Sequence, residues 1–437
     1  MQEYKDPCQI HVQISSADRP GILAEALKSV VFFDWDVLDI KQFVFNGLLN
    51  LSLLLGSKKS NSILELQAAL EKWAMEHGIS LQILPWERGL RPEARYKYRS
   101  VVTLLGPNLS SEVFLHLTQI FSSRDINILR IEQLDHSDHH VIEVVIGSKE
   151  DHSTVDILNA LVKFKEKFMV DIAVQEDTMF RRNKRLIVFD ADMTFLQCEI
   201  IDELGKIAGV GNRMREITHR AMNGELDFKL ALCERVKLLK GLSVSQLEEL
   251  YDRIPITHGA EDLVRILQYL GYRIGIVSGG FQFFIDRIKN NYKLDYGISN
   301  QLEIIDDKLT GRVIGDVVDA RAKEHALISI AKQEGFSLKQ VVAVGDGAND
   351  IHMLASAGLG IAFNAKSVVQ RHANAGINQS NLELILYFLG INGKEVQELR
   401  EVSKSNPKSD WWPFCKSPYI SLNPLLQYFY AFKSINL

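Results

Sequence analysis

The sequence predicts an α/β protein in which two βαββαβ units precede a domain built on a parallel sheet with a helical insertion. Two observations predict this architecture. Residues 1–178 contain two successive segments in which strand-like and helical patterns follow in the same order. Residues 184–390 instead alternate short β-branched runs with helical stretches. Each run ends in small or acidic residues, as in a parallel sheet between helices.

The first βαββαβ unit, within residues 1–88, begins with the alternating strand pattern QIHVQIS and the turn Asp18-Arg19-Pro20-Gly21. Apolar residues at helical spacing follow the turn. Two strand-like runs come next, VLDIKQFVF and LLNLSLLLG, then the helical segment ILELQAALEKWAMEHG and the short strand LQILP. Strands and helices in this order indicate a ferredoxin-like unit.

The second unit, residues 98–178, repeats that order. The strand RSVVTLLG leads to a helix around SSEVFLHLTQIFSSR, and two strands follow, NILRIEQL and HVIEVVIGS. The helix VDILNALVKFKEKF and the strand VDIAVQED complete the unit. The linker between the units, PWERGLRPEARYK, is charged and contains Pro and Gly, as expected of a domain boundary. We therefore interpret residues 1–178 as a ferredoxin-like pair.

Bulk composition excludes several classes of protein. The chain has 437 residues, a net charge of −5 and four cysteines without CxxC spacing. The charge does not suggest a nucleic-acid surface, and scattered cysteines are typical of free thiols in a reducing cytosol. The start, MQEYKDPCQ, lacks the apolar core of a signal peptide, and no apolar run approaches the ~18 residues of a membrane span. We expect a cytoplasmic protein with neither nucleic-acid nor membrane partners.

Three strands of the third region, residues 184–390, end in residues that carry chemistry. In an open parallel sheet, loops at the carboxyl ends of the strands form the reactive crevice. Carboxylates gathered there repel one another, and a hard cation such as Mg²⁺ holds them together through oxygen. A serine followed by two glycines suits a phosphoryl oxygen, and Lys323 could supply positive charge. The strand-end residues are Asp190 and Asp192, Ser278-Gly279-Gly280, and the run from Asp346 to Asp350.

Each of these signals is weak alone, because turns are rich in Asp and Gly, but their order along the chain is specific. The segments DADMT, SGG, Lys323 and GDGAND resemble the four motifs of the haloacid-dehalogenase (HAD) superfamily. The further segments EIIDELGKIAG, ITHRAMNGELDF, ERVKLLKGL and GDGANDIHMLASAGLGIAF are similar to its phosphoserine phosphatase branch over essentially the whole third region. The paired units before it resemble ACT domains, regulatory modules that often bind amino acids, with DRPGI as a typical first turn.

The resemblance implies a HAD-like sheet and Mg²⁺-dependent hydrolysis of O-phospho-L-serine through an aspartyl phosphate, the final step of serine biosynthesis. Asp190 would attack phosphorus, and Asp192 would protonate the departing oxygen and then deprotonate water. Mg²⁺ would lie on the carboxylates of Asp190 and Asp346 and on the backbone carbonyl of Asp192. Supporting residues would be Asp350 and Thr194. The resemblance also assigns Ser278, Gly279 and Lys323 to the phosphoryl oxygens, with Asn349 orienting nearby groups.

The helical insertion, about residues 199–254, resembles the family's cap, which selects the substrate. The resemblance places Glu199 on the substrate's ammonium and Arg235 on its carboxylate, which a guanidinium grips in a bidentate manner. By residue type alone, Glu199 equally fits a helix first turn and Arg235 a solvated helix face. Phe228 fits either the lining of the cap or ordinary core.

Two features depart from the family. Met193 stands where the family usually has Ser in the first motif, so a local hydrogen bond is absent. Residues 391–437 extend beyond the family core, first with a charged helical pattern and then with many aromatic residues. We expect this aromatic-rich extension to pack on the body of the protein or on another subunit.

Other functions remain open from the sequence. A phosphatase of the same mechanism could act on another small phosphorylated metabolite. Receiver domains also place a phosphorylatable Asp at a strand end, and the ACT pair could make a non-catalytic amino-acid sensor. The long insertion and the four retained motifs favour the enzyme. The ACT resemblance also predicts a homodimer or larger oligomer with an amino-acid effector.

Overall fold

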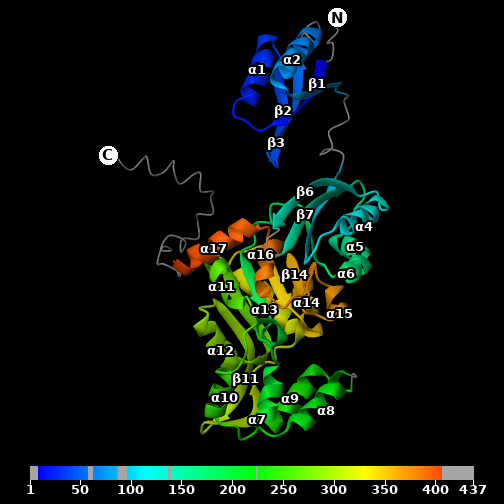
Figure 1. Ribbon diagram of the computed structural model, residues 1–437. Helices are drawn as coiled ribbons and strands as arrows, with labels where there is room; N and C mark the ends of the chain where they lie inside the picture. The colour runs from blue at the N-terminus through cyan, green and yellow to red at the C-terminus, as the bar shows by residue number, and fades with distance from the viewer. Residues whose placement is uncertain (1–7, 58–62, 87–95, 136–138, 223–224, 406–437) are drawn as a thin grey trace, which may run out of the picture. The chain divides into compact units, whose positions relative to one another are not determined.

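The computed structural model describes residues 8–57, 63–86, 96–135, 139–222 and 225–405. The chain divides into two compact units, unit 1 (Met1–Arg95) and unit 2 (Tyr96–Leu437) (Figure 1). The aromatic-rich part of the C-terminal extension, from residue 406 on, lies outside the described residues. Among the described residues, no helix has the length and apolar character needed to cross a membrane.

Within its described residues, unit 1 is a four-stranded antiparallel sheet in the order β2-β3-β1-β4, with two helices. Alternate residues of β1, Ile10, Val12 and Ile14, are buried against the helices, which is why this segment forms a one-sided strand. The prediction of a βαββαβ unit is confirmed. Its elements are β1 (Cys8–Ala17), α1 (Ile22–Phe32), β2 (Asp36–Phe45), β3 (Leu48–Ser57), α2 (Ile63–His77) and β4 (Ser80–Pro85).

Unit 2 begins with strands in the equivalent order, β6-β7-β5-β8, whose core packs against α4, α5 and α6. The helix expected over residues 155–168 is two helices, because the chain leaves helical hydrogen bonding at Leu161, which bonds to the carbonyl of Leu158. The elements are β5 (Tyr98–Gly106), α4 (Ser111–Ser122), β6 (Asn127–Asp135), β7 (His140–Ser148), α5 (Thr154–Ala160), α6 (Val162–Phe168) and β8 (Asp171–Glu176).

The rest of unit 2 is a sheet covered by helices on both faces. In β9 all four residues are buried, and they alternate between two cores. Ile187 and Phe189 pack with the helices α11 and α12, whereas Leu186 and Val188 pack with α13 and α14. The strands are β9 (Leu186–Phe189), β10 (Arg273–Phe281), β11 (Tyr296–Ile305), β12 (Lys308–Ile314), β13 (Val341–Gly345), β14 (Leu359–Phe363) and β15 (Ala375–Ile377). The helices are α11 (Ala260–Tyr269), α12 (Gln282–Asn291), α13 (Ala320–Gln333), α14 (Ile351–Ser356), α15 (Ser367–Gln370), α16 (Ile385–Phe388) and α17 (Gly393–Ser405).

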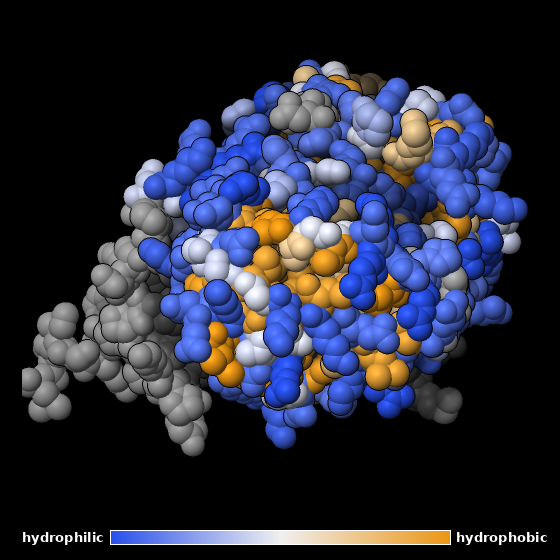
Figure 2. All heavy atoms as spheres, turned by 90° about the horizontal axis from the view of Figure 1, so that it is seen from below, coloured by the Kyte–Doolittle hydropathy of each residue, from blue (hydrophilic) through white to orange (hydrophobic). Residues whose placement is uncertain are grey.

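The strand order β11-β10-β9-β13-β14-β15 is parallel throughout, and the β11–β12 hairpin extends it antiparallel at one edge. This parallel sheet, with a helical insertion after β9, confirms the predicted fold class. The insertion contains four helices, α7 (Ile200–Ile207), α8 (Gly211–Met222), α9 (Phe228–Leu238) and α10 (Val244–Tyr251), at the lower end of the ribbon in Figure 1. We call these four helices the cap. Seen from below, this end of unit 2 exposes an apolar patch (Figure 2).

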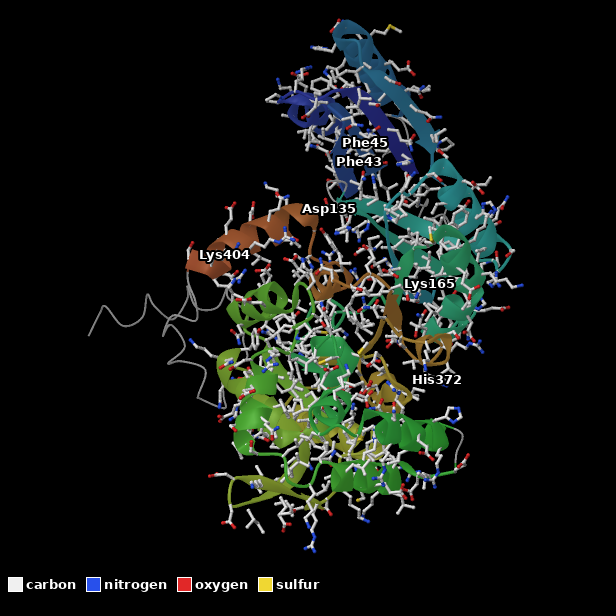
Figure 3. All side chains as sticks on the ribbon, turned by 60° about the horizontal axis from the view of Figure 1, so that its bottom comes forward. Phe43, Phe45, Asp135, Lys165, His372 and Lys404 are labelled. Carbon is white, nitrogen blue, oxygen red and sulfur yellow. The ribbon has the colours of Figure 1, made fainter. Side chains whose placement is uncertain are left out.

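A continuous sheet joins the second ferredoxin-like segment to the parallel core. Strand β8 pairs antiparallel with β15, opposing Ala173 to Ala375, and this pairing creates a sheet of 11 strands. The buried amide of Gln175 donates to the carbonyl of Phe388 at 2.8 Å. Tyr387 donates a hydrogen bond to Asp135, which lies at the end of β6 (Figure 3). Residues 98–178 and 184–390, which the sequence analysis treats as separate domains, therefore lie in one compact unit.

Candidate active site

Neighbouring parallel strands bring the candidate catalytic residues together. Strand β9 lies between β10 and β13, and Phe189 at its end is paired with Ile276 on one side and Val344 on the other. Asp190 and Asp192 follow β9, and Asp346 follows β13. The carboxyl ends of parallel strands meet at one edge of the sheet, as the sequence analysis expects. The backbone N–H of Asp190 donates to the carbonyl of Val344 at 2.8 Å, which holds the two strand ends in register.

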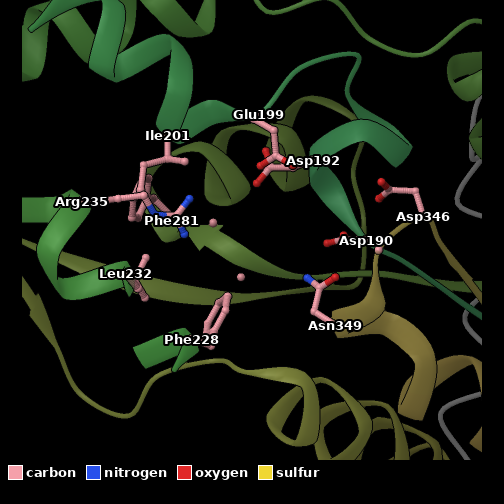
Figure 4. A pocket seen from close by; sticks show the side chains of 13 residues that line it. Asp190, Asp192, Glu199, Ile201, Phe228, Leu232, Arg235, Phe281, Asp346 and Asn349 are labelled. Atoms are coloured by element: carbon pink, nitrogen blue, oxygen red, sulfur yellow. The ribbon is translucent and has the colours of Figure 1, made fainter. Parts of the chain in front are cut away.

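A cavity of about 100 Å³ opens at this edge, between the sheet and the cap (Figure 4). Of the residues predicted from the sequence, seven line it: Asp190, Asp192, Glu199, Arg235, Gly279, Asp346 and Asn349. Ser278, Lys323, Asp350 and Thr194 are buried and do not line it. Gly280 and Gly347, which belong to the strand-end segments named from the sequence, and Phe228 also line the cavity, and the lining residues that the sequence does not point to are Ile201, Leu232 and Phe281.

Lys323 pairs with two carboxylates beneath the cavity. Its Nζ lies 2.7 Å from Oδ1 of Asp190 and 2.8 Å from Oδ1 of Asp350, and all three side chains are almost completely buried. Burial alone lowers the pKa of the Lys323 ammonium, but the two carboxylates outweigh burial and raise the pKa above its usual value. Burial, followed by the charge of Asp350, raises the pKa of Asp190 well above its usual value, although Lys323 opposes that shift.

Three carboxylates form a cluster that fits a hard cation. Oxygens of Asp190, Asp346 and Asp350 all lie within 4.8 Å of one another. The hydroxyl of Thr194 donates to Oδ1 of Asp346 at 3.2 Å and so orients that carboxylate. Burial, then the charges of Asp350 and Glu199, raises the pKa of Asp346 to about 6. A divalent cation with oxygen ligands suits this donor set, because it replaces the repulsion between the carboxylates with attraction.

Asp192 has the protonation behaviour that an acid–base group needs. Burial, followed by the negative charge of Glu199, raises its pKa to about 7. Its Oδ1 accepts a hydrogen bond of 3.2 Å from the N–H of Ile200, the first residue of α7. The next residue, Met193, has a φ of 55° and a side chain that is 44% exposed. Met193 does not line the cavity, so the departure from the family motif does not alter its walls.

The cap contributes two opposite charges to the cavity (Figure 4). Desolvation in the cavity and the charge of Asp202 raise the pKa of Glu199, whereas Arg235 opposes that shift. Burial lowers the pKa of Arg235, and its buried Nε has no hydrogen-bond partner among the described residues. A guanidinium in this condition favours an anionic ligand, because a buried donor without a partner is costly.

Two buried residues near the site were missed by the sequence analysis. The hydroxyl of Thr257 donates to the carbonyl of Thr194 at 2.7 Å. The side-chain amide of Asn300 on β11 donates to the carbonyl of Gly279 at 2.8 Å. Neither residue belongs to a recognisable motif. Asn300 lies in the largely polar run SNQLEI, where its residue type does not distinguish it from its polar neighbours.

Comparisons with known proteins agree with this architecture. The model of the haloacid dehalogenase-like hydrolase family matches residues 187–355, and an ACT domain model matches residues 9–83. A phosphoserine phosphatase of Streptomyces coelicolor is 38% identical over 386 residues, which cover 88% of this chain and 93% of that protein. A phosphoserine phosphatase of Archaeoglobus fulgidus is 51% identical over 227 residues, 52% of this chain and 66% of that protein.

Among solved structures, the probable phosphoserine phosphatase of Vibrio cholerae resembles this chain with a TM-score of 0.54 at 33% identity. The likeness covers 72% of this chain and 93% of that one. The family matches and the Streptomyces relative together extend over both units, so the same two kinds of domain occur in a known protein in the same order.

Proposed function

Because this chain belongs to the phosphoserine phosphatases of the haloacid dehalogenase-like hydrolase family, we propose that it hydrolyses O-phospho-L-serine to L-serine and phosphate. One observation, the arrangement of charged groups around the cavity, supports phosphoserine as the substrate. On the cap side, the cavity has the acidic Glu199 and Arg235, whose buried Nε has no hydrogen-bond partner among the described residues, and the Asp190–Lys323 pair lies at the sheet edge. The ammonium of a small phosphorylated amino acid complements Glu199, its carboxylate complements Arg235, and its phosphate complements Lys323.

The carboxylate of Asp190 is the nucleophile of the proposed reaction. A bond forms between its oxygen and phosphorus while the bond from phosphorus to the serine oxygen breaks. Asp192 gives its proton to the departing serine oxygen. In the second half, Asp192 accepts a proton from water as the water attacks the aspartyl phosphate, and phosphate leaves. A pKa of about 7 suits both roles at neutral pH, because the group is near half protonation.

Members of this family generally use a divalent metal, and we propose Mg²⁺ for this chain. The carboxylates of Asp190 and Asp346 and the backbone carbonyl of Asp192 would hold it, with Asp350 and Thr194 in support. When bound, the ion supplies positive charge that offsets the charge of the phosphoryl oxygens. Ser278, Gly279 and Lys323 would bind the same oxygens from the protein side, and Asn349 would orient the group.

On the cap, Glu199 would receive the substrate's ammonium and Arg235 its carboxylate. Phe228 lines the cavity and would give the serine carbons an apolar wall, and its ring atom Cζ lies 3.2 Å from the position that a Cβ would take at Gly279. A side chain at residue 279 would therefore close the space between the cap and the phosphate-binding segment.

Phosphate release tests the function. The full-length protein is assayed with phosphoserine and a panel of small phosphorylated metabolites, with Mg²⁺ or with a chelator, and Asp190→Asn serves as the inactive control. We expect the highest kcat/KM for phosphoserine and no turnover with the chelator. A higher kcat/KM for another phosphomonoester would replace phosphoserine as the substrate and leave the reaction class standing.

We further propose that unit 1 binds a free amino acid, L-serine as the expected product, at the turn Asp18–Gly21. Gly21, with a φ of 99°, lets the chain turn directly into α1. The guanidinium of Arg19 forms an ion pair with the carboxylate of Glu25 on α1 at 2.8 Å. Glu25 also accepts a hydrogen bond of 3.3 Å from the indole N–H of Trp73 on α2, so these contacts link the turn to both helices. The second segment has Gly106 and Pro107 at the equivalent place, so its site would be degenerate.

We also propose that unit 1 pairs with a second copy of the chain. All ten residues of its edge strand β2 are exposed, and Phe43 and Phe45 are 62% and 65% exposed (Figure 3). A long apolar edge strand is a template for pairing. Unit 1 has a core of its own, so residues 1–95 can be titrated alone with serine and other amino acids by calorimetry. Sedimentation of the full chain measures its oligomeric state. No heat with any amino acid, from a fragment verified as a dimer, would leave unit 1 a dimerisation surface only.

A further inference from the structure

The phosphate-binding segment of β10 is a bulge. The pairs Val277–Ile298 and Phe281–Asn300 join β10 to β11. Between them β10 has Ser278, Gly279 and Gly280, whereas β11 has Ser299 alone. Extra residues of this kind bend a strand, and two of these three, Gly279 and Gly280, line the cavity. The hydroxyl of Ser278 accepts a hydrogen bond of 2.8 Å from the N–H of Gly280, so the first and last residues of the bulge are bonded to each other.

Asn300 holds this bulge from the neighbouring strand. Its side chain is fully buried, and its Nδ2 donates to the carbonyl of Gly279 at 2.8 Å. Its Oδ1 accepts from the backbone N–H of Val318 at 2.8 Å. A primary amide offers both a donor and an acceptor, so this one side chain bonds to a backbone carbonyl and to a backbone N–H at the same time.

The hydrogen bond from Val318 to Asn300 lies just before α13, the helix that carries Lys323. Val318 precedes Asp319, whose carboxylate caps α13 by accepting from the N–H groups of Arg321 and Ala322 at 3.0 and 2.9 Å. The N–H of Lys323 donates to the carbonyl of Asp319 at 2.9 Å, which is the first turn of that helix. Asp319, which follows Val318, therefore caps the first turn of the helix that carries Lys323.

We propose that Asn300 is a positioning residue that sets the distance between the Ser278–Gly279 bulge and Lys323. These are the two sides of the proposed phosphoryl-binding site. This inference rests on the proposed function, because it assigns both sides to the phosphoryl group. Without the Asn300 amide, the carbonyl of the half-buried Gly279 and the buried N–H of Val318 both lose the side-chain group that they bond to. The bulge and the start of α13 then move independently of each other. The distance between the Ser278–Gly279 bulge and Lys323 increases, so the phosphoryl group is bound less closely.

The test compares Asn300→Ala with Gln268→Ala in the full-length protein. Gln268 is the control, since its side-chain amide also bonds to two backbone groups, the carbonyls of Tyr292 and Lys293 at 2.8 and 3.1 Å, but to none of the residues proposed to bind the phosphoryl group. Four quantities are measured: the inhibition constant of inorganic phosphate, KM and kcat for phosphoserine, the Mg²⁺ concentration for half-maximal activity, and the melting temperature.

We expect the phosphate inhibition constant of Asn300→Ala to rise about tenfold, as for the loss of two ordinary hydrogen bonds. KM for phosphoserine should rise with it, and the half-maximal Mg²⁺ concentration should stay within about twofold. Gln268→Ala should lower the melting temperature and leave the phosphate constant unchanged. If Asn300→Ala does not accumulate in folded form, Asn300→Ser, which fills more of the space, is measured in the same way with the same expectation.

Three results would overturn the inference. One is an unchanged phosphate constant in the Asn300 variant, another is an equal rise of the phosphate constant in Gln268→Ala, and the third is a parallel rise in the Mg²⁺ requirement. Each of these would make Asn300 a general support of the fold. A wild-type protein that hydrolyses a different phosphomonoester would overturn the substrate and leave this test intact, because phosphate is the product in either case.

Discussion

The ammonium of Lys323 lies 2.7 Å from the carboxylate of Asp190 and 2.8 Å from that of Asp350, with all three side chains withdrawn from water. The ammonium of Lys323 thus balances two carboxylates at the place where we propose that a metal and a phosphate bind. Removing a single partner from a buried ion pair leaves an uncompensated charge and is costly. Catalysis and stability are therefore linked at this residue, which the first prediction addresses.

Lys323→Met should be inactive and less stable by about 3–5 kcal/mol, the typical cost of breaking a buried pair. Denaturant unfolding with chelator present measures the free energy of unfolding without a contribution from metal. The double variant Lys323→Met with Asp350→Asn is the control, because it removes one of the stranded charges and should recover part of the loss. Equal stability of wild type and Lys323→Met would contradict a structural role for the ion pair.

Asp190→Asn should abolish turnover, because an amide neither attacks phosphorus nor adds charge to the metal cluster. Asp192→Asn should lower the rate ~10²–10⁴-fold and retain more capacity to form phosphoenzyme, because it removes only proton transfer. Rapid-quench labelling with radioactive phosphoserine measures the phosphoenzyme. Full activity of Asp190→Asn would end the aspartyl-phosphate proposal.

Arg235→Ala should impair phosphoserine far more than phosphoethanolamine, which lacks the carboxylate. A charged hydrogen-bonded contact contributes roughly 1.5–3 kcal/mol, so the ratio of the two kcat/KM values should fall at least tenfold. Arg253→Ala, which removes an exposed ion pair with Glu249 on the cap, is the control and should leave that ratio unchanged. An equal loss for both substrates would make Arg235 a structural residue.

Stabilisation by Mg²⁺ should be larger at pH 8 than at pH 5. In the metal-free protein the pKa of Asp192 is raised to about 7 and that of Asp346 to about 6. Carboxyls of the unfolded chain titrate near pH 4. Between these values the folded protein binds more protons than the unfolded chain, so its stability falls as pH rises through that window.

At pH 8 the carboxyls of Asp192 and Asp346 are deprotonated, so Mg²⁺ binds without displacing protons. At pH 5 these carboxyls hold protons, and Mg²⁺ must compete with the protons to bind. The shift in melting temperature between chelator and excess Mg²⁺, measured at both pH values, tests this. Asp346→Asn should reduce the shift at pH 8. Equal shifts at the two pH values in the wild type would show that these carboxylates do not bind the ion.

A fragment of residues 96–437 should fold and retain phosphatase activity, whereas a fragment of residues 179–437 should be less stable. The shorter fragment loses the β8–β15 pairing and the hydrogen bond from Gln175 to Phe388, each buried bond contributing roughly 1 kcal/mol. It also exposes the edge of β15. Thermal melts and solubility measure the difference. Equal stability of the two fragments would mean that the shared sheet is incidental to the catalytic core.

Local patterns in the sequence determined most of the elements and the main site. Ile10, Val12 and Ile14 alternate with polar residues, so they already define a one-sided strand. The run Leu186–Phe189 is apolar throughout because helices cover both faces. Asp190, Asp192 and Asp346 follow such runs directly, and parallel order alone brings strand ends together. These features depend on neighbours in the chain, which a single sequence displays.

Only the tertiary structure decided the features that depend on distant segments. Nothing in the short strand Ala375–Ile377 indicates that it pairs with β8, because register between remote strands depends on the packing of everything between them. Asn300 looks like any polar strand residue until the bulge of β10 places the Gly279 carbonyl beside it. Whether Arg235 lies in solvent or in a cavity likewise depends on how the cap closes over the sheet. A side chain's type is local, whereas its burial and its partners arise from contacts between residues far apart in the sequence.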